Sequence, residues 1–318
     1  MKLFYHINLF HLKNNDMKTL RVTLIVNLFC CLSFLLQSQN HELGISLGTS
    51  NFLGDLGGAN HIGVPFLEDV EPTLFRPAGG VFYRYNMKRV LSFEANFLAT
   101  ELRGDDKLIG NGPVFSDFWF RHYRNLNFKS FIASISVNVQ LDLLRYKTKY
   151  KNHTYWTPFI GAGVGLFYMN PKANLGNGWI SLQPLGTEGQ GLPGHQKIYS
   201  RIQPNFPISF GIKYQYNKHW KLELSCVHHI TLTDYIDDVS TVYVDPIELN
   251  ANYDKEKAAL VASIARRSVE LDKDNLYGNV TAPGQQRGNP KNKDSYFMVL
   301  FKISYVFGTS HYDYNCFK

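Results

Sequence analysis

The sequence predicts an all-β protein, an eight-stranded antiparallel transmembrane β-barrel with short periplasmic turns and long extracellular loops. Three observations lead to this class: eight segments alternate apolar and polar residues, the N-terminal segment has the form of a secretory signal, and the connections alternate between short and long. The chain has 318 residues, of which 14% are aromatic. Aromatic side chains are abundant at the two interfaces of membrane barrels, so this composition agrees with the predicted class.

Residues 1–38 are predicted to be an N-terminal extension followed by a signal peptide. The apolar run 20–36 is about one helical turn shorter than the roughly 20 residues that cross a bilayer as a helix, and it follows a basic segment that contains Lys18. This order of charge and apolar core is typical of a secretory signal, with cleavage expected after Ser38. Met17 is an alternative first residue, since it opens the segment that has the normal basic region.

The remaining chain carries only a mild positive charge. Loss of residues 1–38 removes four cations and one aspartate, which lowers the formal net charge from +7 to about +4. This excess is too small to predict a nucleic-acid partner. The expected surroundings of the mature chain are instead the lipids of the outer membrane, in which it is integral.

Eight segments alternate apolar and polar residues, which indicates strands with two different faces. Successive side chains of a strand point to opposite faces, so each segment presents one apolar face. Most of the segments reach the roughly 9 to 11 residues that cross a bilayer at a tilt. In chain order the segments are 42–48, 79–85, 90–100, 131–141, 159–169, 206–216, 220–232 and 297–307.

The third and the last of these segments show the two faces directly. The apolar row of 90–100 is Leu91, Phe93, Ala95, Phe97 and Ala99. The apolar row of 297–307 is Phe297, Val299, Phe301, Ile303, Tyr305 and Phe307. A soluble β-sandwich would bury such rows against a second sheet, whereas a barrel turns them toward lipid. Their aromatic ends favour the barrel, with Phe307 as the last residue of the closing strand.

The connections between the segments alternate in length. The short ones are 86–89, 144–155 and 217–219, and the long ones are 49–77, 101–127, 170–204 and 233–294. Outer-membrane barrels have short periplasmic turns and long outside loops. An even number of strands places both chain ends in the periplasm, so we expect a barrel over residues 39–307 and a periplasmic tail over 308–318.

The polar face carries charges that would lie inside the barrel. An eight-stranded barrel has an interior just wide enough for side chains to fill it. We therefore expect these charges to pair into a plug rather than line a pore, which disfavours passive transport. The residues are Arg84, Glu94, Lys213, Glu223 and Lys302.

All three short turns are basic, and they are the candidate partner-binding surface. The residues are Lys88, Arg89, Arg145, Lys147, Lys149, Lys151, Lys218 and Lys221. One interpretation is that these cations pair with the phosphate groups of the inner leaflet and hold the barrel at its depth. The other is that they form a docking surface for an acidic partner.

The cysteines suggest a second contact with a partner. Cys30 and Cys31 leave with the signal, so only Cys226 and Cys316 remain in the mature chain. Cys226 is expected on the lipid face of its strand, where it would be inert, and Cys316 lies three residues from the C-terminus. An odd thiol in an oxidising compartment suggests either an intermolecular disulfide through Cys316 or a lone reactive thiol.

Metal and enzymatic chemistry are weakly indicated. The loop acids Asp234, Asp237, Asp238 and Asp245 are weak candidates for a hard-cation site, because they lack the glycine-hinged spacing of an EF-hand. His228 and His229 precede them, but neighbours in a strand point to opposite faces, and no serine or second acid stands out as a partner. We expect no enzyme, cofactor or metal.

One helix is predicted, over residues 254–270 of the longest loop. Ala258, Leu260 and Val261 share its apolar side with two later residues, Ile264 and Ala265. This helix either caps the barrel or lies on a neighbouring molecule, and the sequence does not choose between the two.

The loops carry a resemblance to a known family. The stretch ISLQPLGTEGQGLPG at 180–194, the stretch TDYIDDVSTVYVDP at 233–246 and NFLGDLGG at 51–58 look like the Bacteroidetes outer-membrane barrel family typified by PorG of the type IX secretion system. The resemblance extends over nearly all of the mature chain.

This resemblance implies a non-enzymatic envelope protein. It would anchor a periplasmic ring, made of a lipoprotein and its soluble partner, to the outer membrane and support protein secretion. The alternative is a structural or adhesive outer-membrane barrel that binds a ligand through its extracellular loops.

Overall fold

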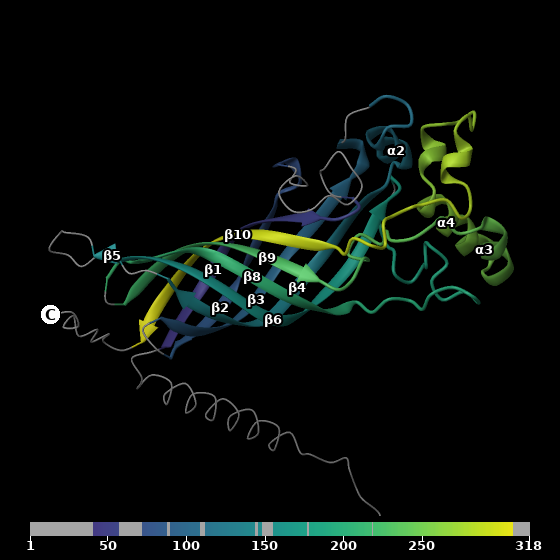
Figure 1. Ribbon diagram of the computed structural model, residues 1–318. Coiled ribbons are helices and arrows are strands. Elements are labelled where there is room, and N and C mark those ends of the chain that lie inside the picture. Colours follow the sequence, from purple (N-terminus) through teal and green to yellow (C-terminus); the bar gives the residue numbers. More distant parts are fainter. Residues whose placement is uncertain are drawn as a thin grey trace, which may run out of the picture.

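The chain folds into a closed antiparallel β-barrel, here described from a computed structural model (Figure 1). The described residues are 41–56, 72–87, 90–108, 112–143, 146–147, 155–176, 178–217 and 219–307. Each strand pairs with its neighbour in the chain, and the pairing of the first with the last closes the ring. The eight strands are β1 (His41–Leu53), β2 (Arg76–Asn86), β3 (Leu91–Asp105), β4 (Asn127–Asp142), β6 (Tyr155–Asn174), β8 (Ile202–Gln215), β9 (Trp220–Thr231) and β10 (Ser295–Phe307).

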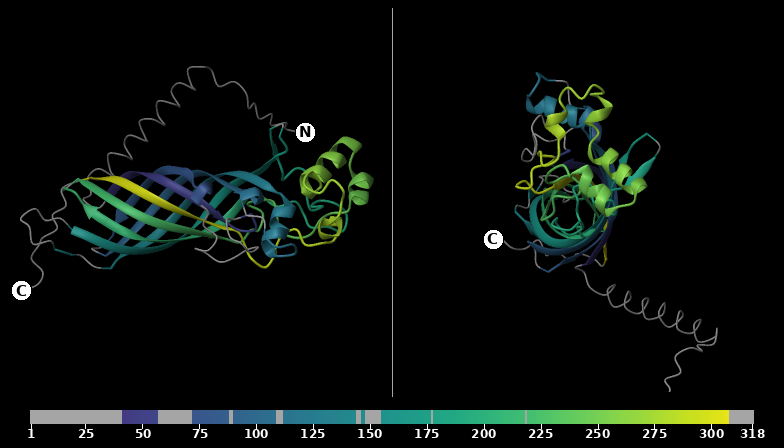
Figure 2. Two further views of the ribbon diagram at one scale, coloured as in Figure 1. Left: turned by 90° about the horizontal axis from the view of Figure 1, so that it is seen from above. Right: turned by 90° about the vertical axis from the view of Figure 1, so that its right-hand side faces the viewer.

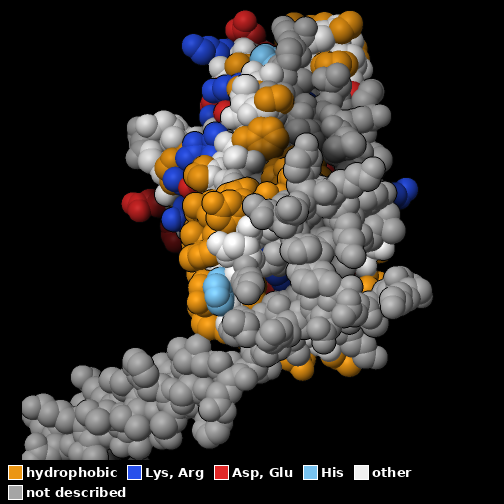
Figure 3. All heavy atoms as spheres, turned by 90° about the vertical axis from the view of Figure 1, so that its left-hand side faces the viewer, with side chains coloured by type: hydrophobic (Ala, Val, Ile, Leu, Met, Phe, Trp, Pro, Cys, Tyr) orange, Lys and Arg blue, Asp and Glu red, His pale blue; other side chains and the backbone are white. Residues whose placement is uncertain are grey.

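The eight predicted segments correspond one to one to these strands, so the predicted fold class is confirmed. The alternation places the predicted apolar rows on the outside. For example, Leu47 and Ile135 are each 61% exposed, whereas Ser46, which directly precedes Leu47 in β1, is completely buried. Figure 3 shows hydrophobic side chains along the visible flank of the described barrel wall. An apolar belt of this extent around a closed barrel is suited to lipid, and the protein is a transmembrane barrel.

Short and long connections lie at opposite ends of the barrel, as predicted. At one end β5 (Tyr146–Lys147) pairs with the first residues of β6 and extends that hairpin beyond the ring (Figure 1). We call this the turn end. At the other end, the loop end, lie the short strand β7 (Trp179–Ser181) and the helices of the described residues (Figure 1). Seen from the loop end, the loops and helices lie over and beside the mouth of the barrel (Figure 2).

The predicted helix is confirmed in part. Helix α4 (Lys255–Ala265) begins where Asp254 accepts a hydrogen bond from the Lys257 backbone N–H, and it is followed by the 3-10 turn η4 (Ser268–Glu270). The sequence did not predict α2 (Asp117–Arg124) or α3 (Pro246–Asn252), because helices of seven or eight residues show too little periodicity. The other 3-10 turns are η2 (Pro72–Leu74), η3 (Asp106–Leu108) and η5 (Gly278–Thr281).

None of the helices in the described ranges is long and apolar enough to cross a membrane.

The apolar side of helix α4 is covered by loops of the same chain at the loop end. Its buried residues Ala258, Val261 and Ile264 pack against side chains from the β6–β8 loop and the β9–β10 loop, including Leu185 and Leu249. The four buried helix positions all belong to the apolar side that the sequence predicted. The apolar side of this helix is therefore buried against its own chain rather than free to lie on a neighbouring molecule.

Aromatic rings from four neighbouring strands, β6, β8, β9 and β10, line the turn end. Trp156 lies against Tyr214 with ring centroids 4.6 Å apart, and Trp220 lies against Tyr305 at 5.3 Å. Phe307 follows at 5.5 Å from Tyr305. Aromatic rings of this kind mark the membrane interface of barrels, so the aromatic ends of the apolar rows serve as one girdle.

Candidate functional site

The part of the barrel interior toward the turn end contains Arg84, a fully buried guanidinium from β2. It pairs with Glu42 of β1 at 3.1 Å, with Glu223 of β9 at 2.5 Å, and through Nε with Glu94 of β3 at 2.9 Å. The three carboxylates are at most 3% exposed. One cation thus holds three carboxylates that come from three different strands.

Further cations complete the network. Lys302 of β10 lies 2.8 Å from Glu94 and 3.2 Å from Glu223, and Lys221 of β9 pairs with Glu42. Lys213 of β8 lies 2.9 Å from Asp142 of β4. Together these groups are four cations and four carboxylates from seven of the eight strands, with Lys213 and Asp142 as a separate pair. Burying ions is costly unless they are paired, and this balance confirms the predicted plug.

Above this network the barrel is filled by an apolar core. Phe52, Phe128 and Phe167 point inward from three strands and are at most 1% exposed. Two residues of the β9–β10 loop, Ile236 and Val239, pack into the same cluster and are equally buried. The loop end of the lumen is therefore closed by packed side chains of a loop, in addition to the ions below.

Four aspartates, Asp55, Asp234, Asp237 and Asp294, lie close together where the β9–β10 loop enters the barrel. Asp237 accepts the backbone N–H groups of Leu56 and Val239 at 3.1 and 2.9 Å, and Asp294 accepts that of Ile236 at 2.8 Å. Asp55 accepts the backbone N–H of Asn289 at 2.6 Å.

The pKa values of this aspartate cluster are raised. Burial raises the pKa of Asp234 to about 7, and the charges of Asp55 and Glu188 add to the shift. Burial, followed by the other aspartates, also raises the pKa of Asp237 and Asp294 well above the usual range. The pKa of Asp55 is raised by burial although the nearby Arg124 opposes the shift. The cluster therefore holds protons more tightly in the folded chain than in the unfolded chain.

Two buried arginines connect the loops at the loop end. We call these loops, which follow β1, β3, β6 and β9, together with their helices, the cap. Arg287 donates to Glu188 at 2.8 Å, and Arg124 donates to Asp106 at 2.9 Å. Arg124 also donates to the backbone carbonyls of Asp55 and Arg287, at 2.7 and 2.9 Å. These bonds join the loops that follow β1, β3, β6 and β9, so the cap is one cross-linked body.

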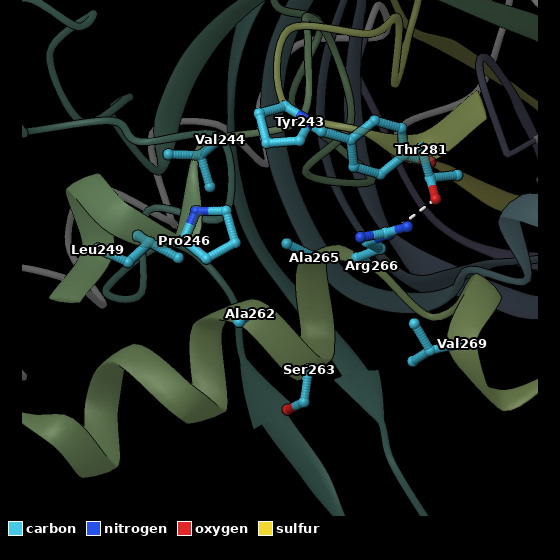
Figure 4. A pocket seen from close by; sticks show the side chains of 11 residues that line it. Tyr243, Val244, Pro246, Leu249, Ala262, Ser263, Ala265, Arg266, Val269 and Thr281 are labelled. Atoms are coloured by element: carbon cyan, nitrogen blue, oxygen red, sulfur yellow. Dashed lines mark hydrogen bonds between the residues drawn. The ribbon is translucent and has the colours of Figure 1, made fainter. Parts of the chain in front are cut away.

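The cap contains a small apolar pocket next to α3 and α4 (Figure 4). Its volume is about 290 Å³, and its walls include Val244, Leu249, Ala262 and Val269. Arg266 lies at its edge and donates to Thr281 at 2.8 Å. The pocket suits a small apolar group and has one cation at its rim.

Most of the predicted partner-binding residues lie outside the described residues. These are Lys88, Arg89, Arg145, Lys149, Lys151, Lys218 and Cys316. The signal segment 1–38 also lies outside them. The backbone of Lys147 is described as part of β5, which places it in a hairpin as expected. Lys221 is directed to Glu42 in the interior, so its charge belongs to the network inside the barrel.

The weak metal candidates have other roles in the described chain. Asp245 caps α3 by accepting the Ile247 backbone N–H at 2.8 Å. Asp238 accepts hydrogen bonds from Thr187 at 2.5 Å and from Tyr199 at 2.6 Å, and its pKa is raised by burial to about 6. Within the described ranges, no three His, Cys, Asp or Glu side chains are placed to hold a metal ion.

The paired histidines of β9 point to opposite faces, as predicted. His229 is completely buried, accepts a hydrogen bond from the side-chain amide of Asn205 at 3.1 Å and stacks on Tyr296. His228 lies on the outer face with Cys226, which is a free thiol. The two imidazoles therefore cannot act on one substrate.

The buried ion pairs between the loops at the loop end were not predicted from the sequence. Arg287 and Glu188 are 99 residues apart, and Arg124 lies 69 residues from Asp55. No local spacing relates such residues, because their contact depends on the register of separate strands. A signal was present only in the clustering of acids in the 234–238 stretch.

The chain was compared with known proteins. No curated protein matches it. Neisserial surface protein A (NspA) has a similar structure at 8% sequence identity and a TM-score of 0.35, covering 84% of this chain and 97% of that chain. Ail, the attachment invasion locus protein of Yersinia pestis, has 8% identity and a TM-score of 0.33 over 84% and 99%. The N-terminal β-barrel domain of Pseudomonas aeruginosa OprF has 9% identity and a TM-score of 0.29 over 84% and 97%.

A family model covers most of the chain. The model described as Domain of unknown function (DUF6089) matches residues 21–242, which is well over half of the 318 residues and includes seven of the eight barrel strands. This protein belongs to the DUF6089 family.

Proposed function

We propose that this protein is a non-enzymatic outer-membrane component of the type IX secretion system that anchors the periplasmic ring complex to the outer membrane. Its partners would be the ring lipoprotein and the soluble subunit bound to it. The barrel itself would hold position in the outer membrane, and the turn end, facing the periplasm, would make the contact.

The closed interior is the observation that carries the scaffold role. A balanced network of eight charged side chains fills the barrel at one level, and packed rings fill it above. A barrel closed in this way offers no path to a solute, so function has to reside on its two ends and its outer wall. The absence of a convergent catalytic set among the described residues is compatible with a scaffold.

The resemblance of the loop sequences supports the more specific role. The stretches at 51–58, 180–194 and 233–246, on which that resemblance rests, fall largely on loops that form the cap. The basic turns supply a chemical reason for docking, since seven or more cations near one membrane surface attract an acidic partner.

Crosslinking tests where the partner docks. A photo-reactive residue at Lys149 or Lys218 should form an adduct with a periplasmic ring subunit, whereas the same residue at Lys255 on α4 should not. The Lys255 position is the matched control, because it also replaces a lysine and is exposed at the loop end. Ring adducts from Lys255 alone, or from neither end, would overturn the anchor.

A second function is favoured by the cap. Its cross-linked loops present the 290 Å³ pocket and several exposed apolar side chains, among them Ile247 at 75% exposure and Leu276 at 73%. The protein would then be a structural or adhesive barrel that binds a ligand outside the cell. Adducts formed only from Lys255, with an extracellular molecule, would favour this function over the anchor.

A further inference from the structure

Three cations form a continuous row across the outer wall of the barrel near the loop end. Arg103 of β3 lies directly opposite Lys129 of β4 in the sheet, and Lys129 lies directly opposite Lys172 of β6. All three lie on the outward face, since the positions before them, Leu102 and Phe128, are buried inside the barrel. We call this set the cationic row.

Within the described residues, fewer negative charges lie beside the cationic row than the row has positive charges. Like charges at directly opposite positions of neighbouring strands destabilise a sheet. Among the described residues, the carboxylate that pairs with the row is Glu101, at 2.5 Å from Arg103 and 3.7 Å from Lys129. The described ion pairs of the wall include none for Lys172. Glu101 therefore pairs with two of the three cations, and an added anion would relieve the repulsion along the row.

The row lies directly above the apolar belt. Phe131 follows Lys129 by two residues on the same face of β4 and is 51% exposed, and Ile135, further along this face, is 61% exposed. Two residues of a strand span about 6.6 to 6.8 Å, which is less along the membrane normal because barrel strands are tilted. The cations are thus placed at the height of lipid headgroups, just beyond the ends of the acyl chains.

An interfacial tryptophan covers the row. Trp179 of β7 is 37% exposed, and its ring centroid lies 4.4 Å from the Lys129 Nζ and 5.9 Å from the Arg103 guanidinium carbon. Tryptophan is enriched at the level of the headgroups. The contacts also hold the two cationic side chains in position on the wall.

We propose that the cationic row binds the phosphate group of an anionic lipid of the outer leaflet. Arg103 supplies a planar fork that suits phosphate oxygens, and the two lysines supply compact charges on the other side of the group. The acyl chains of the same lipid lie against Phe131 and Ile135. This binding depends on the barrel's position in the membrane and is independent of the secretion role.

The test uses the mature full-length barrel in detergent micelles. Bisphosphorylated lipid A, the same lipid without its phosphates and inorganic pyrophosphate are added separately. Bound lipid is measured by native mass spectrometry, and the thermal midpoint by loss of heat-modifiable mobility. We expect retention and a raised midpoint with the phosphorylated lipid alone.

Two matched triple variants identify the site. Arg103→Gln, Lys129→Gln and Lys172→Gln together should weaken binding of the phosphorylated lipid at least tenfold. Lys255→Gln, Lys257→Gln and Lys273→Gln remove the same charge from the cap and should leave binding unchanged. The single variant Lys172→Gln, expected to weaken binding several-fold, serves if the first triple variant does not form a barrel.

Three outcomes would overturn the proposal. Equal binding of the phosphate-free lipid would show that the apolar belt alone selects it. An equal effect of pyrophosphate would indicate a site for free anions. Unchanged binding in the folded row variants would place the lipid elsewhere on the wall.

Discussion

At the residue scale, the position of a side chain along its strand decides its surroundings. Lys302 lies inside the barrel and touches two glutamates, whereas its neighbour Phe301 is 46% exposed on the outer wall. The same inward position places Arg84 among three carboxylates. Charge inside this barrel is tolerated only because each ion has partners.

Removal of the central cation should destabilise the barrel strongly. Arg84→Met leaves three carboxylates short of one positive charge, and the loss of one partner of a buried pair costs about 3 to 5 kcal/mol. Lys213→Met is the matched control, since Lys213 lies at the edge of the network and pairs with one carboxylate. Urea unfolding in detergent, followed by circular dichroism, should show the larger loss for Arg84→Met. An equal or smaller loss would contradict the central role of Arg84.

The aspartate cluster should make the cap less stable as pH rises. The folded pKa of Asp234, about 7, lies above the value of about 4 expected for the unfolded chain. The folded cap therefore holds the proton more tightly, and this stabilisation is complete below about pH 4 and is lost as pH rises through about 7. After correction for the intrinsic exchange rate at each pH, amide hydrogen exchange of the 233–294 loop should be slower at pH 5 than at pH 8.

A substitution separates this cluster from a general effect of pH. Asp234→Asn removes the charge and should slow exchange of the loop at pH 8, by about 1 to 3 kcal/mol of opening free energy, as expected for a buried unpaired polar group. Asp274→Asn, at an exposed position of the same cap, should change nothing. Equal exchange in wild type at both pH values, after correction for the intrinsic rate, would refute the effect.

At the element scale, each strand is specified by two faces and each short helix by its caps. β10 carries the clearest outward row and closes the ring by pairing with β1 over its whole length. Helix α4 begins at the Asp254 cap and is held by its buried side. The strands therefore form from their own pattern, whereas the helices depend on the loops that surround them.

Charge on the outward face of β10 should prevent assembly. Replacing Phe301 and Phe307 with lysine places charge against lipid, at a cost of up to about 2 to 4 kcal/mol each, depending on depth. The double variant should be lost from the outer membrane and should lack a heat-modifiable form on gels. Lys291→Glu with Lys293→Glu, in the loop before β10, is the control and should assemble normally. A normal level of folded double variant would refute the lipid-facing assignment.

At the scale of the whole molecule, the barrel is closed twice, by ions at one level and by a folded loop at another. The paired ions come from seven strands, and hydrogen bonds of the cap connect four loops. The two ends differ in kind, because one carries hairpins and the other an ordered, cross-linked body. This asymmetry directs partners to the two ends and leaves the wall to lipid.

The purified barrel should not conduct ions. In a planar bilayer the wild-type protein should give no regular current steps under conditions in which a porin does, because paired ions and packed rings fill the lumen. Steps of uniform size that scale with protein concentration would contradict this closure. A matched porin channel in the same bilayer controls for insertion.

The C-terminal cysteine remains a prediction. If Cys316 forms a disulfide with a periplasmic ring subunit, non-reducing gels of native envelopes should show a larger band that collapses on reduction. The tether would make electrostatic docking intramolecular and raise its effective concentration. Cys316→Ser should lack the band, while Cys226→Ser should retain it, since Cys226 lies on the outer wall of β9. One mobility with and without reductant in wild type would rule out the tether.

The sequence by itself determined the strands, their faces and the pairing of charges inside the barrel. Alternation with period two is a local property, so it can be read without knowing which strand lies beside which. That Arg84, Glu94 and Lys302 face the interior follows from this parity alone, and an eight-stranded ring is narrow enough for inward side chains at the same level to meet. The alternating loop lengths likewise distinguished the two ends.

Only the tertiary structure decided the cap, the aspartate cluster and the cationic row. Arg103, Lys129 and Lys172 are neighbours because of strand register, and a shift of one residue would turn any of them to the other face. Arg287 meets Glu188 only after two long loops have folded over the barrel mouth. Contacts of this kind depend on how distant segments are brought together in space, for which the local pattern of residues carries no signal.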